Sequence, residues 1–333
     1  MSQLQSPQTL AILSCVAHQA DASIAEISKH TGLRDHKIRY CLSNLRDRGI
    51  ISPALQINPY TLGYTEYYIF FTVENSSSAR SRIVQTLCST PEVFWVGELG
   101  TAFQFGASIL SKGVHELVAI LQRISQRAGG AIIERTVATC YSLYTAVSHV
   151  LSEKKVPIPF LWYGDDGKRV EIDEVDHAIL RALSLNPFKS YGQLGREIGR
   201  PASTVDYRVK AMRKSGVIVG LEYRIDYSVL GLTSFPAMLY LRQTTPEVHQ
   251  KLLQFCLRSP FVSYYASLIG RWDSELGVKI RDPRELSTVS EQLNDLLGPA
   301  LARVEFYTDI KCHKLEAYPF HAFPRPKGPI KAR

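Results

Sequence analysis

Two stretches of the chain place cations, tyrosines and small polar residues together at helical spacing. Aliphatic residues recur every three to four positions in both, which predicts a helix with one buried face and one polar face. Residues 29–48 and 196–214 each hold six Lys or Arg and two acids, a net charge of +4. Exposed cations hold phosphates, and side chains near the start of such a helix meet base edges in the major groove. These residues therefore favour binding of double-stranded DNA.

The candidate DNA-contacting residues are the polar side chains that remain once the buried face of each helix is removed. The first stretch supplies Arg34, His36, Lys37, Arg39, Tyr40, Asn44 and Arg46. The second supplies Ser203, Thr204, Tyr207, Arg208, Lys210, Arg213 and Lys214. The whole chain has 39 Lys and Arg against 31 acids, a formal charge of +8, which favours a polyanionic partner. One basic helix is commonly only a solvated surface, but two at matching positions favour a nucleic-acid interface.

The two stretches occupy matching places in a chain that repeats itself. DRGIISPALQINPYTLGY at 47–64 resembles KSGVIVGLEYRIDYSVLGL at 214–232, half the chain further on. Around each, three short amphipathic helical patterns predict a helix-turn-helix domain. The order strand, helix, strand, strand, helix, strand follows and predicts a ferredoxin-like βαββαβ motif. The predicted fold class is α+β, a tandem repeat of a helix-turn-helix domain and a ferredoxin-like domain. We call the two repeats the first and second copy.

Domain borders are expected where Pro, Gly and charged residues gather. VPIPFLWYGDDGKRVEI at 156–172 holds two prolines and a Gly-Asp-Asp-Gly cluster, a composition that predicts a linker. The C-terminal residues are basic and Pro-rich, which predicts a flexible tail. The expected segments are helix-turn-helix domains at 1–60 and 173–230, ferredoxin-like domains at 61–150 and 231–318, a linker at 151–172 and the tail at 319–333.

The sequence disfavours several classes of protein. No apolar run approaches the roughly 20 residues that a membrane helix needs. The six cysteines form no CxxC pair and none lies at zinc-binding spacing from histidines, which predicts reduced thiols and no metal or cofactor. The sequence has no nucleophile elbow, phosphate-binding loop or HExxH motif. We therefore predict a protein of the cytoplasm that is not an enzyme and has no membrane partner.

The phrases DHAILRALS, RVKAMRKSGVIVG and DYSVLG in the second copy match the N-terminal pattern of a known family. Each copy resembles the Lrp/AsnC transcription regulators, over about residues 8–148 and 173–318. The resemblance implies a winged helix-turn-helix domain joined to a ferredoxin-like domain that senses amino acids. It also implies that Arg208 stands at the arginine usual in the family's recognition helix, where the first copy has Cys41.

The family's sensing domain has a Gly-acid-aromatic-Asp turn between its second and third strands, and amino-acid effectors bind near that turn. The resemblance therefore implies effector-binding residues in both copies, which are Gly97, Glu98, Gly270, Arg271, Trp272 and Asp273. An amino acid needs a carboxylate for its ammonium group, a cation for its carboxylate and an apolar wall for its side chain. Glu98 and Asp273, then Arg271, then Trp272 are the expected sources. The alternative is that a glycine in a tight strand turn needs no ligand.

We expect one chain to carry what is normally a dimer, an intramolecular pseudo-dimer, and the family implies that whole chains pair further. Two alternatives to a regulator stay open. Siroheme decarboxylases resemble this architecture and sometimes occur as fused pairs, but the corresponding stretch YYASLIGRWDSELGV lacks the histidine, proline and asparagine of their usual segment. The second alternative is a ligand sensor that no longer binds DNA, and the exposed basic residues are the feature that distinguishes it.

Overall fold

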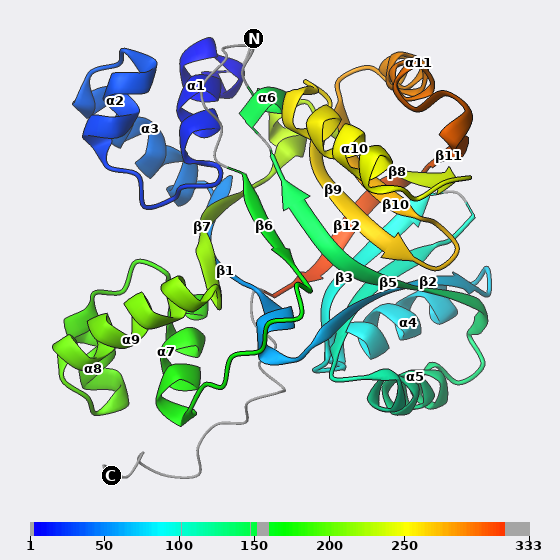
Figure 1. Cartoon of the computed structure of the whole chain (residues 1–333), viewed down its shortest axis with the longest axis horizontal. Helices are drawn as coiled ribbons and strands as arrows, with labels where there is room; N and C mark the ends of the chain where they lie inside the picture. The colour runs from blue at the N-terminus through cyan, green and yellow to red at the C-terminus, as the bar shows by residue number, and fades with distance from the viewer. Residues whose placement is uncertain (1–2, 101, 147, 152–159, 317–333) are drawn as a thin grey trace. The chain divides into compact units, whose positions relative to one another are not determined.

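The computed structural model describes residues 3–100, 102–146, 148–151 and 160–316 of the 333-residue chain (Figure 1). Its elements form two compact units, each built from separate parts of the chain. The first unit comprises Met1–Ala54, Ser142–Trp162 and Leu221–Asp309, and the second comprises Leu55–Tyr141, Tyr163–Gly220 and Ile310–Arg333. Each unit therefore combines the helix-turn-helix domain of one copy with the ferredoxin-like domain of the other.

The helix-turn-helix domain of the first unit consists of α1 (Pro7–Val16), α2 (Ile24–Thr31) and α3 (Asp35–Asp47). Ser6 and Ser23 cap α1 and α2, because each side chain accepts a hydrogen bond from a backbone N–H of the first turn. Gly32 ends α2 in the left-handed conformation, with φ of 72°, which glycine adopts without strain. The tight turn that follows sets the angle at which α3 leaves α2.

The helix-turn-helix domain of the second unit consists of α7 (Glu174–Leu185), α8 (Tyr191–Ile198) and α9 (Ala202–Ser215). Asp173 and Ser190 cap α7 and α8, and Gly216 ends α9 with φ of 82°. A strand follows the third helix in each copy, β1 (Ile51–Ile57) and β7 (Ile218–Ile225), and the two strands pair into a two-stranded sheet. The predicted helix-turn-helix plan is confirmed in both copies.

The ferredoxin-like domain of the first copy lies in the second unit, apart from the last residues of its final strand. Its elements are β2 (Thr65–Val73), α4 (Ser77–Ser89), β3 (Val93–Gly100), β4 (Phe105–Ser111), α5 (Val114–Ala128) and β5 (Ile132–Thr145). The strands are antiparallel in the order β5-β2-β4-β3, and β12 (Thr308–Leu315) adds to the β3 edge. Ile69, Ile83 and Ile120 from β2, α4 and α5 are fully buried in one core, so the helices cover one face of the sheet.

The ferredoxin-like domain of the second copy lies in the first unit and repeats this topology. Its elements are β8 (Thr233–Leu241), α10 (Pro246–Arg258), β9 (Val262–Ile269), β10 (Ser274–Ile280), α11 (Glu285–Leu297) and β11 (Leu301–Phe306). The strand order is β11-β8-β10-β9, which is the order of the first copy, so the predicted βαββαβ motif is confirmed. The short elements are η1 (Gln3–Gln5), η2 (Pro59–Leu62), α6 (Ser148–Leu151), η3 (Tyr227–Leu230) and η4 (Gly298–Ala300).

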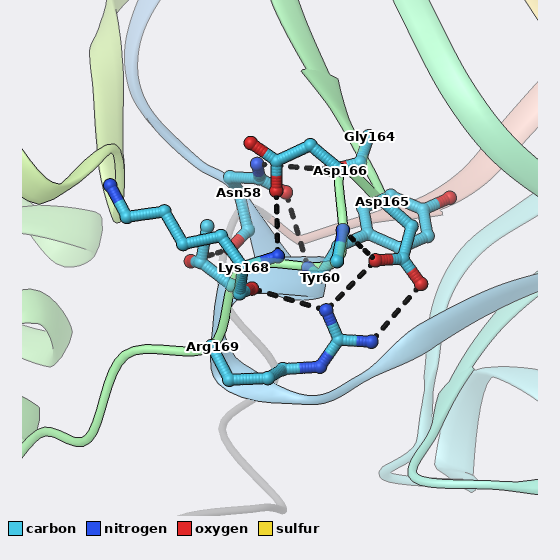
Figure 2. A network of polar contacts seen from close by, with 9 residues as sticks. Asn58, Tyr60, Gly164, Asp165, Asp166, Lys168 and Arg169 are labelled. Carbon is cyan, nitrogen blue, oxygen red and sulfur yellow. Dashed lines mark hydrogen bonds and ion pairs between the residues drawn. The ribbon is translucent and has the colours of Figure 1, made fainter.

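The segment between the copies ends in an ordered turn of the second unit. β6 (Leu161–Gly164) pairs with β5. Figure 2 shows that the Asp165 carboxylate then accepts hydrogen bonds from both terminal nitrogens of Arg169, at 2.8 and 3.1 Å. Lys168 donates through Nζ to the Ser215 carbonyl at the end of α9, at 2.8 Å. This turn therefore contacts the second helix-turn-helix domain, whereas residues 152–159 of the predicted linker and the predicted tail at 319–333 lie outside the described residues.

Candidate nucleic-acid interface

The two predicted DNA-contacting helices are α3 and α9, the last helix of each helix-turn-helix domain (Figure 1). Their predicted inward faces are confirmed, and the buried residues are Ile38, Leu42, Leu45, Val205, Val209 and Met212. The predicted contact residues lie on the remaining surface of each helix. Most of them are exposed, and the half-buried ones are Asn44, Thr204 and Arg208.

Tyr40 and Tyr207 occupy the same position in the two copies of the repeat. Their side chains are 65% and 73% exposed, which is high for an aromatic residue. Lys37 lies one turn before Tyr40 and Lys210 one turn after Tyr207, so each ring has a cation beside it on the same face. A phenol offers an apolar ring and a polar hydroxyl, and apolar groups on such a helix contact the methyl group of thymine.

Arg208 is held inside its own domain. Its Nη1 lies 2.7 Å from Asp173 and 3.1 Å from Asp176, two acids at the start of α7, and the Arg208 side chain is only 29% exposed. Partial burial opposes ionisation of Asp173, but hydrogen bonds from the Asp176 backbone and from Arg208 lower its pKa overall. A contact between Arg208 and DNA would have to break both ion pairs, so its role in DNA binding stays a prediction.

The equivalent place in the first copy is uncharged. Cys41 Sγ lies 4.0 Å from the hydroxyl oxygen of Thr9, and Ser6 donates to that same oxygen at 2.9 Å. Burial raises the pKa of the Cys41 thiol, which keeps it protonated and neutral. A groove of about 340 Å³ lies here, and its lining includes Lys37, Tyr40 and Cys41.

Two other candidate cations bind groups of their own helix. Arg46 Nε donates to the Leu42 carbonyl at 3.2 Å, and Lys210 Nζ donates to the Asp206 carboxylate at 2.8 Å. The Lys210 contact is exposed and contributes little to stability, whereas Arg46 also hydrogen-bonds the buried Tyr223. Lys210 can therefore exchange its present contact for a phosphate at small cost.

The predicted effector turn of the first copy is misplaced. Gly97 to Gly100 lie inside β3, not in the turn between β3 and β4. When the strands of the two copies are aligned, the residues that match Trp272 and Asp273 are Phe103 and Gln104. Gln104 accepts from the Val73 N–H through its side chain, as Asp273 accepts from the Leu241 N–H. The offset between the two copies predicts this register closely, whereas pairing Gly97 with Gly270 departs from it.

The turn of the second copy does lie between β9 and β10, as predicted, but its side chains are engaged with the protein. Trp272 is fully buried, so it does not form the wall of an open pocket. Asp273 Oδ2 accepts from the Leu241 backbone at 2.7 Å. Arg271 is exposed and donates through Nε to the Tyr240 hydroxyl at 3.2 Å. Gly270 directly precedes these residues and follows the end of β9.

Glu98 lies in a charged cluster of the second unit. It forms an ion pair with Arg80 of α4, and its second oxygen lies 3.2 Å from Nε2 of His313 in β12. Partial burial works against ionisation, but the bonds from Arg80 and His313 lower the pKa of Glu98 overall. The sequence points to Glu98 but not to its two partners, because Arg80 and His313 lie 18 and 215 residues away in the chain. Within the described residues no group of three or more His, Cys, Asp or Glu is arranged to hold a metal ion.

Comparisons with known proteins agree with this architecture. A winged helix-turn-helix DNA-binding family model matches residues 172–219. An uncharacterized HTH-type transcriptional regulator of Pyrococcus abyssi is 30% identical over 134 residues, which are 40% of this chain and 86% of that protein. The chain belongs to the Lrp/AsnC family. A similar regulator of Pyrococcus horikoshii is 29% identical over 147 residues, 43% of this chain and 90% of that protein, so a whole family member matches the length of one copy.

One solved structure spans both copies of this Lrp/AsnC chain. The crystal structure of the siroheme decarboxylase NirDL, in complex with an iron-uroporphyrin III analogue, covers 95% of this chain and 96% of its own, with a TM-score of 0.62 and 12% identity. At that identity the likeness establishes the fold alone. Of the helices that the structure describes, none is both long and apolar enough to span a bilayer.

Proposed function

We propose that this chain is a sequence-specific DNA-binding transcription regulator that carries two reading helices in one polypeptide. The observation that carries the proposal is the equivalence of α3 and α9. Each is the third helix of a winged helix-turn-helix domain, buries the same three-residue stripe, and exposes a tyrosine beside cations. Helices of this kind enter the major groove with their N-terminal residues toward the bases.

On both helices, the cations and the tyrosines have different roles in DNA recognition. Lys37 and Arg39 on α3, and Lys210, Arg213 and Lys214 on α9, would hold phosphates, which supply affinity and orientation. Tyr40 and Tyr207 would contact base edges. Arg208 is replaced by Cys41 in the first copy, so the two helices would read different half-sites. An imperfect palindrome is the expected target, because the symmetry of a DNA site mirrors that of the protein.

The covalent link makes the chain an intramolecular pseudo-dimer in this proposal. Because the two helix-turn-helix domains lie on one chain, the effective concentration of one relative to the other does not change on dilution. A conventional dimer loses its second reading helix when it dissociates, whereas this chain would keep both. The proposal also keeps an amino-acid effector at the predicted residues of each ferredoxin-like domain, and it allows whole chains to pair further.

DNA selection followed by fluorescence anisotropy tests the proposal. Genomic fragments enriched by the purified chain would be titrated at several salt concentrations. Lys37→Ala with Arg39→Ala, and separately Lys210→Ala with Arg213→Ala, should each weaken binding about 10- to 100-fold and flatten the salt dependence by about one phosphate contact per cation removed. Arg284→Ala is the matched control, since Arg284 is 91% exposed on the ferredoxin-like domain. If both double variants behave like the control, α3 and α9 do not bind DNA.

A second candidate function is catalysis, favoured by the likeness to NirDL over nearly the whole chain. Against it stands the sequence of the β9–β10 region, which lacks the histidine, proline and asparagine expected for such an enzyme. Anaerobic incubation of the protein with siroheme, followed by mass analysis of the tetrapyrrole, separates the two. A decarboxylated product would replace the regulator proposal with an enzymatic one.

A further inference from the structure

A cavity of about 710 Å³ lies within the first unit, and its lining includes none of the predicted effector residues. Its lining comes from the start of α1, the end of α2, the short helix α6, the residues just before β8 and β9, and the end of β10 with the residues that follow it. The volume falls in the range of small-molecule sites, which are usually apolar clefts with a few fixed polar groups. Its walls come from both the helix-turn-helix domain and the ferredoxin-like domain of that unit.

One part of the cavity lining is apolar. Leu151, Leu232 and Ile280 contribute side chains that are otherwise buried in the protein, and Leu10 and Phe261 are half-buried beside them. Apolar walls of this size gain free energy when an apolar molecule displaces water from them. These apolar walls offer no hydrogen-bond partner to a ligand that is polar throughout.

Two cations supply the positive charge of the lining. Lys279 Nζ donates to Ser234 Oγ at 2.8 Å and lies 4.9 Å from the centre of the Tyr227 ring, so its ammonium group is held in place. Arg281 Nη1 donates to the Leu230 carbonyl at 2.7 Å, which fixes the guanidinium while other N–H groups stay available. Both residues line the cavity. Such positioned cations are suited to a carboxylate or sulfonate.

The single acid in the lining is already committed to the backbone. Glu285 accepts hydrogen bonds from the N–H groups of Arg281 and Asp282, at 2.9 and 3.1 Å, at the start of α11. It therefore serves the helix terminus rather than the cavity. His149 also lines the cavity, and burial lowers its pKa, so it is neutral at pH 7. Burial lowers the pKa of Lys279, while Asp309 and Glu275 beside it favour its charged form, so Arg281 carries the permanent positive charge of the lining.

We propose that this cavity binds a small amphipathic organic anion, with the acid group at Lys279 and Arg281 and the apolar body against Leu151, Leu232 and Phe261. An occupant would touch α1 and β10 together. A ligand that prefers one arrangement of these two elements shifts the population toward it. This regulatory role rests on the proposed DNA-binding function: a metabolite bound in the cavity would alter DNA binding by α3. Binding of the metabolite itself does not depend on that function.

The test uses the full chain without DNA and the fluorescent sulfonate 1-anilinonaphthalene-8-sulfonate as probe. Wild type should show one saturable site, and decanoate should displace the probe while decylamine, with the same chain and the opposite charge, should not. Arg281→Gln should weaken probe binding about 10-fold, and Arg281→Lys should restore most of it. Arg284→Gln is the matched control, because Arg284 lies nearby, is 91% exposed and is not part of the cavity lining.

A variant that fills the cavity provides a second test, which does not depend on whether the arginine variants perturb folding. Ala11 lines the cavity from α1, so Ala11→Trp should abolish saturable probe binding and leave the circular dichroism spectrum and both charged residues unchanged. Equal displacement by decanoate and decylamine would overturn the proposal, as would equal probe affinity in Arg281→Gln and Arg284→Gln. Saturable binding that survives Ala11→Trp would place the probe elsewhere and overturn it too.

Discussion

The first and third helices are joined differently in the two helix-turn-helix domains, although the fold is the same. In the second copy Arg208 of α9 pairs with Asp173 and Asp176 of α7. In the first copy the equivalent positions are Cys41, Ser6 and Thr9, and they form an uncharged contact. One backbone arrangement is thus held by an ion-pair clamp in one copy and by hydroxyl and thiol groups in the other.

The two copies also differ on the sheet. Tyr264 donates to the buried carboxyl of Glu275 in the second copy. The matching positions in the first copy are Trp95 and Gly106. A Cβ at Gly106 would lie 2.9 Å from the Trp95 ring, so glycine makes room for the larger aromatic. In both comparisons the second copy places charge where the first copy places neutral bulk or a groove, which predicts that the copies respond differently to pH and substitution.

Glu275→Gln should have the largest effect, and its sign depends on pH. Burial raises the pKa of Glu275 to about 7, against the opposing hydrogen bond from Tyr264. A raised folded-state pKa adds stability that is complete below the unfolded pKa and is lost as pH rises through the folded pKa. Wild type should therefore lose up to about 3 kcal/mol from this group between about pH 4 and pH 8, and Glu275→Gln should remove that loss. Urea unfolding across this pH range measures it.

Glu305→Gln provides a control of opposite sign. Partial burial raises the pKa of Glu305, but hydrogen bonds from Tyr240 and Tyr307 outweigh it and lower the pKa. Its contribution is present above the unfolded pKa and lost as pH falls, so this variant should be less stable than wild type at neutral pH. A pH profile of Glu275→Gln that matches wild type would mean that Glu275 does not fold in its protonated form.

Arg208→Met breaks the charged clamp and leaves two acids facing each other. We expect a loss of about 1–2 kcal/mol, below the value for a fully buried pair because solvent screens the half-exposed Asp173. Hydrogen exchange at α7 and α9 should speed up with it. Lys210→Met is the matched control, since its pair with Asp206 is more exposed and its loss should cost much less stability. Equal losses in the two variants would show that the clamp contributes no more than a surface pair.

The sequence was sufficient for features that depend on local periodicity. The buried stripes of α3 and α9, the helix-ending Gly216 and the order of strands and helices all follow from spacing and turn residues. Features that depend on contacts between residues far apart in the chain could not be predicted from the sequence. Asp173 lies 35 residues from Arg208, and the exchange of domains between the two units requires strand pairing across half the chain.

The misplaced effector turn has a more specific cause. Gly97 and Gly270 are both glycines before a polar residue, but Gly97 has a different structural role. A Cβ there would collide with the ring of Trp95, so the glycine serves packing within β3. Phe103 and Gln104 share no residue type with Trp272 and Asp273, and only the hydrogen bonds to Val73 and Leu241 reveal the equivalence.

Tyr40→Ala and Tyr207→Ala test whether the shared surface of the two copies reads DNA. Each should weaken specific binding about 10-fold, with little change in the salt dependence, because a tyrosine removes no charge. Each should also relax the base preference of one half-site only. Anisotropy on single-base variants of the selected site measures both effects. Loss of affinity with no change in base preference would assign the tyrosines to the DNA backbone instead.

Transplanting the charged clamp into the first copy should have the smallest effect. Thr9→Asp alone puts an acid at a buried position, and Cys41→Arg alone puts a cation beside neutral hydroxyls, so each single variant should be destabilised. Together the two side chains recreate the pair formed by Asp176 and Arg208. The double variant should recover about 1 kcal/mol of the summed loss in a double-mutant cycle. Strict additivity would mean that the α1–α3 groove is not shaped to hold the clamp, and that the difference between the two copies extends to their backbones.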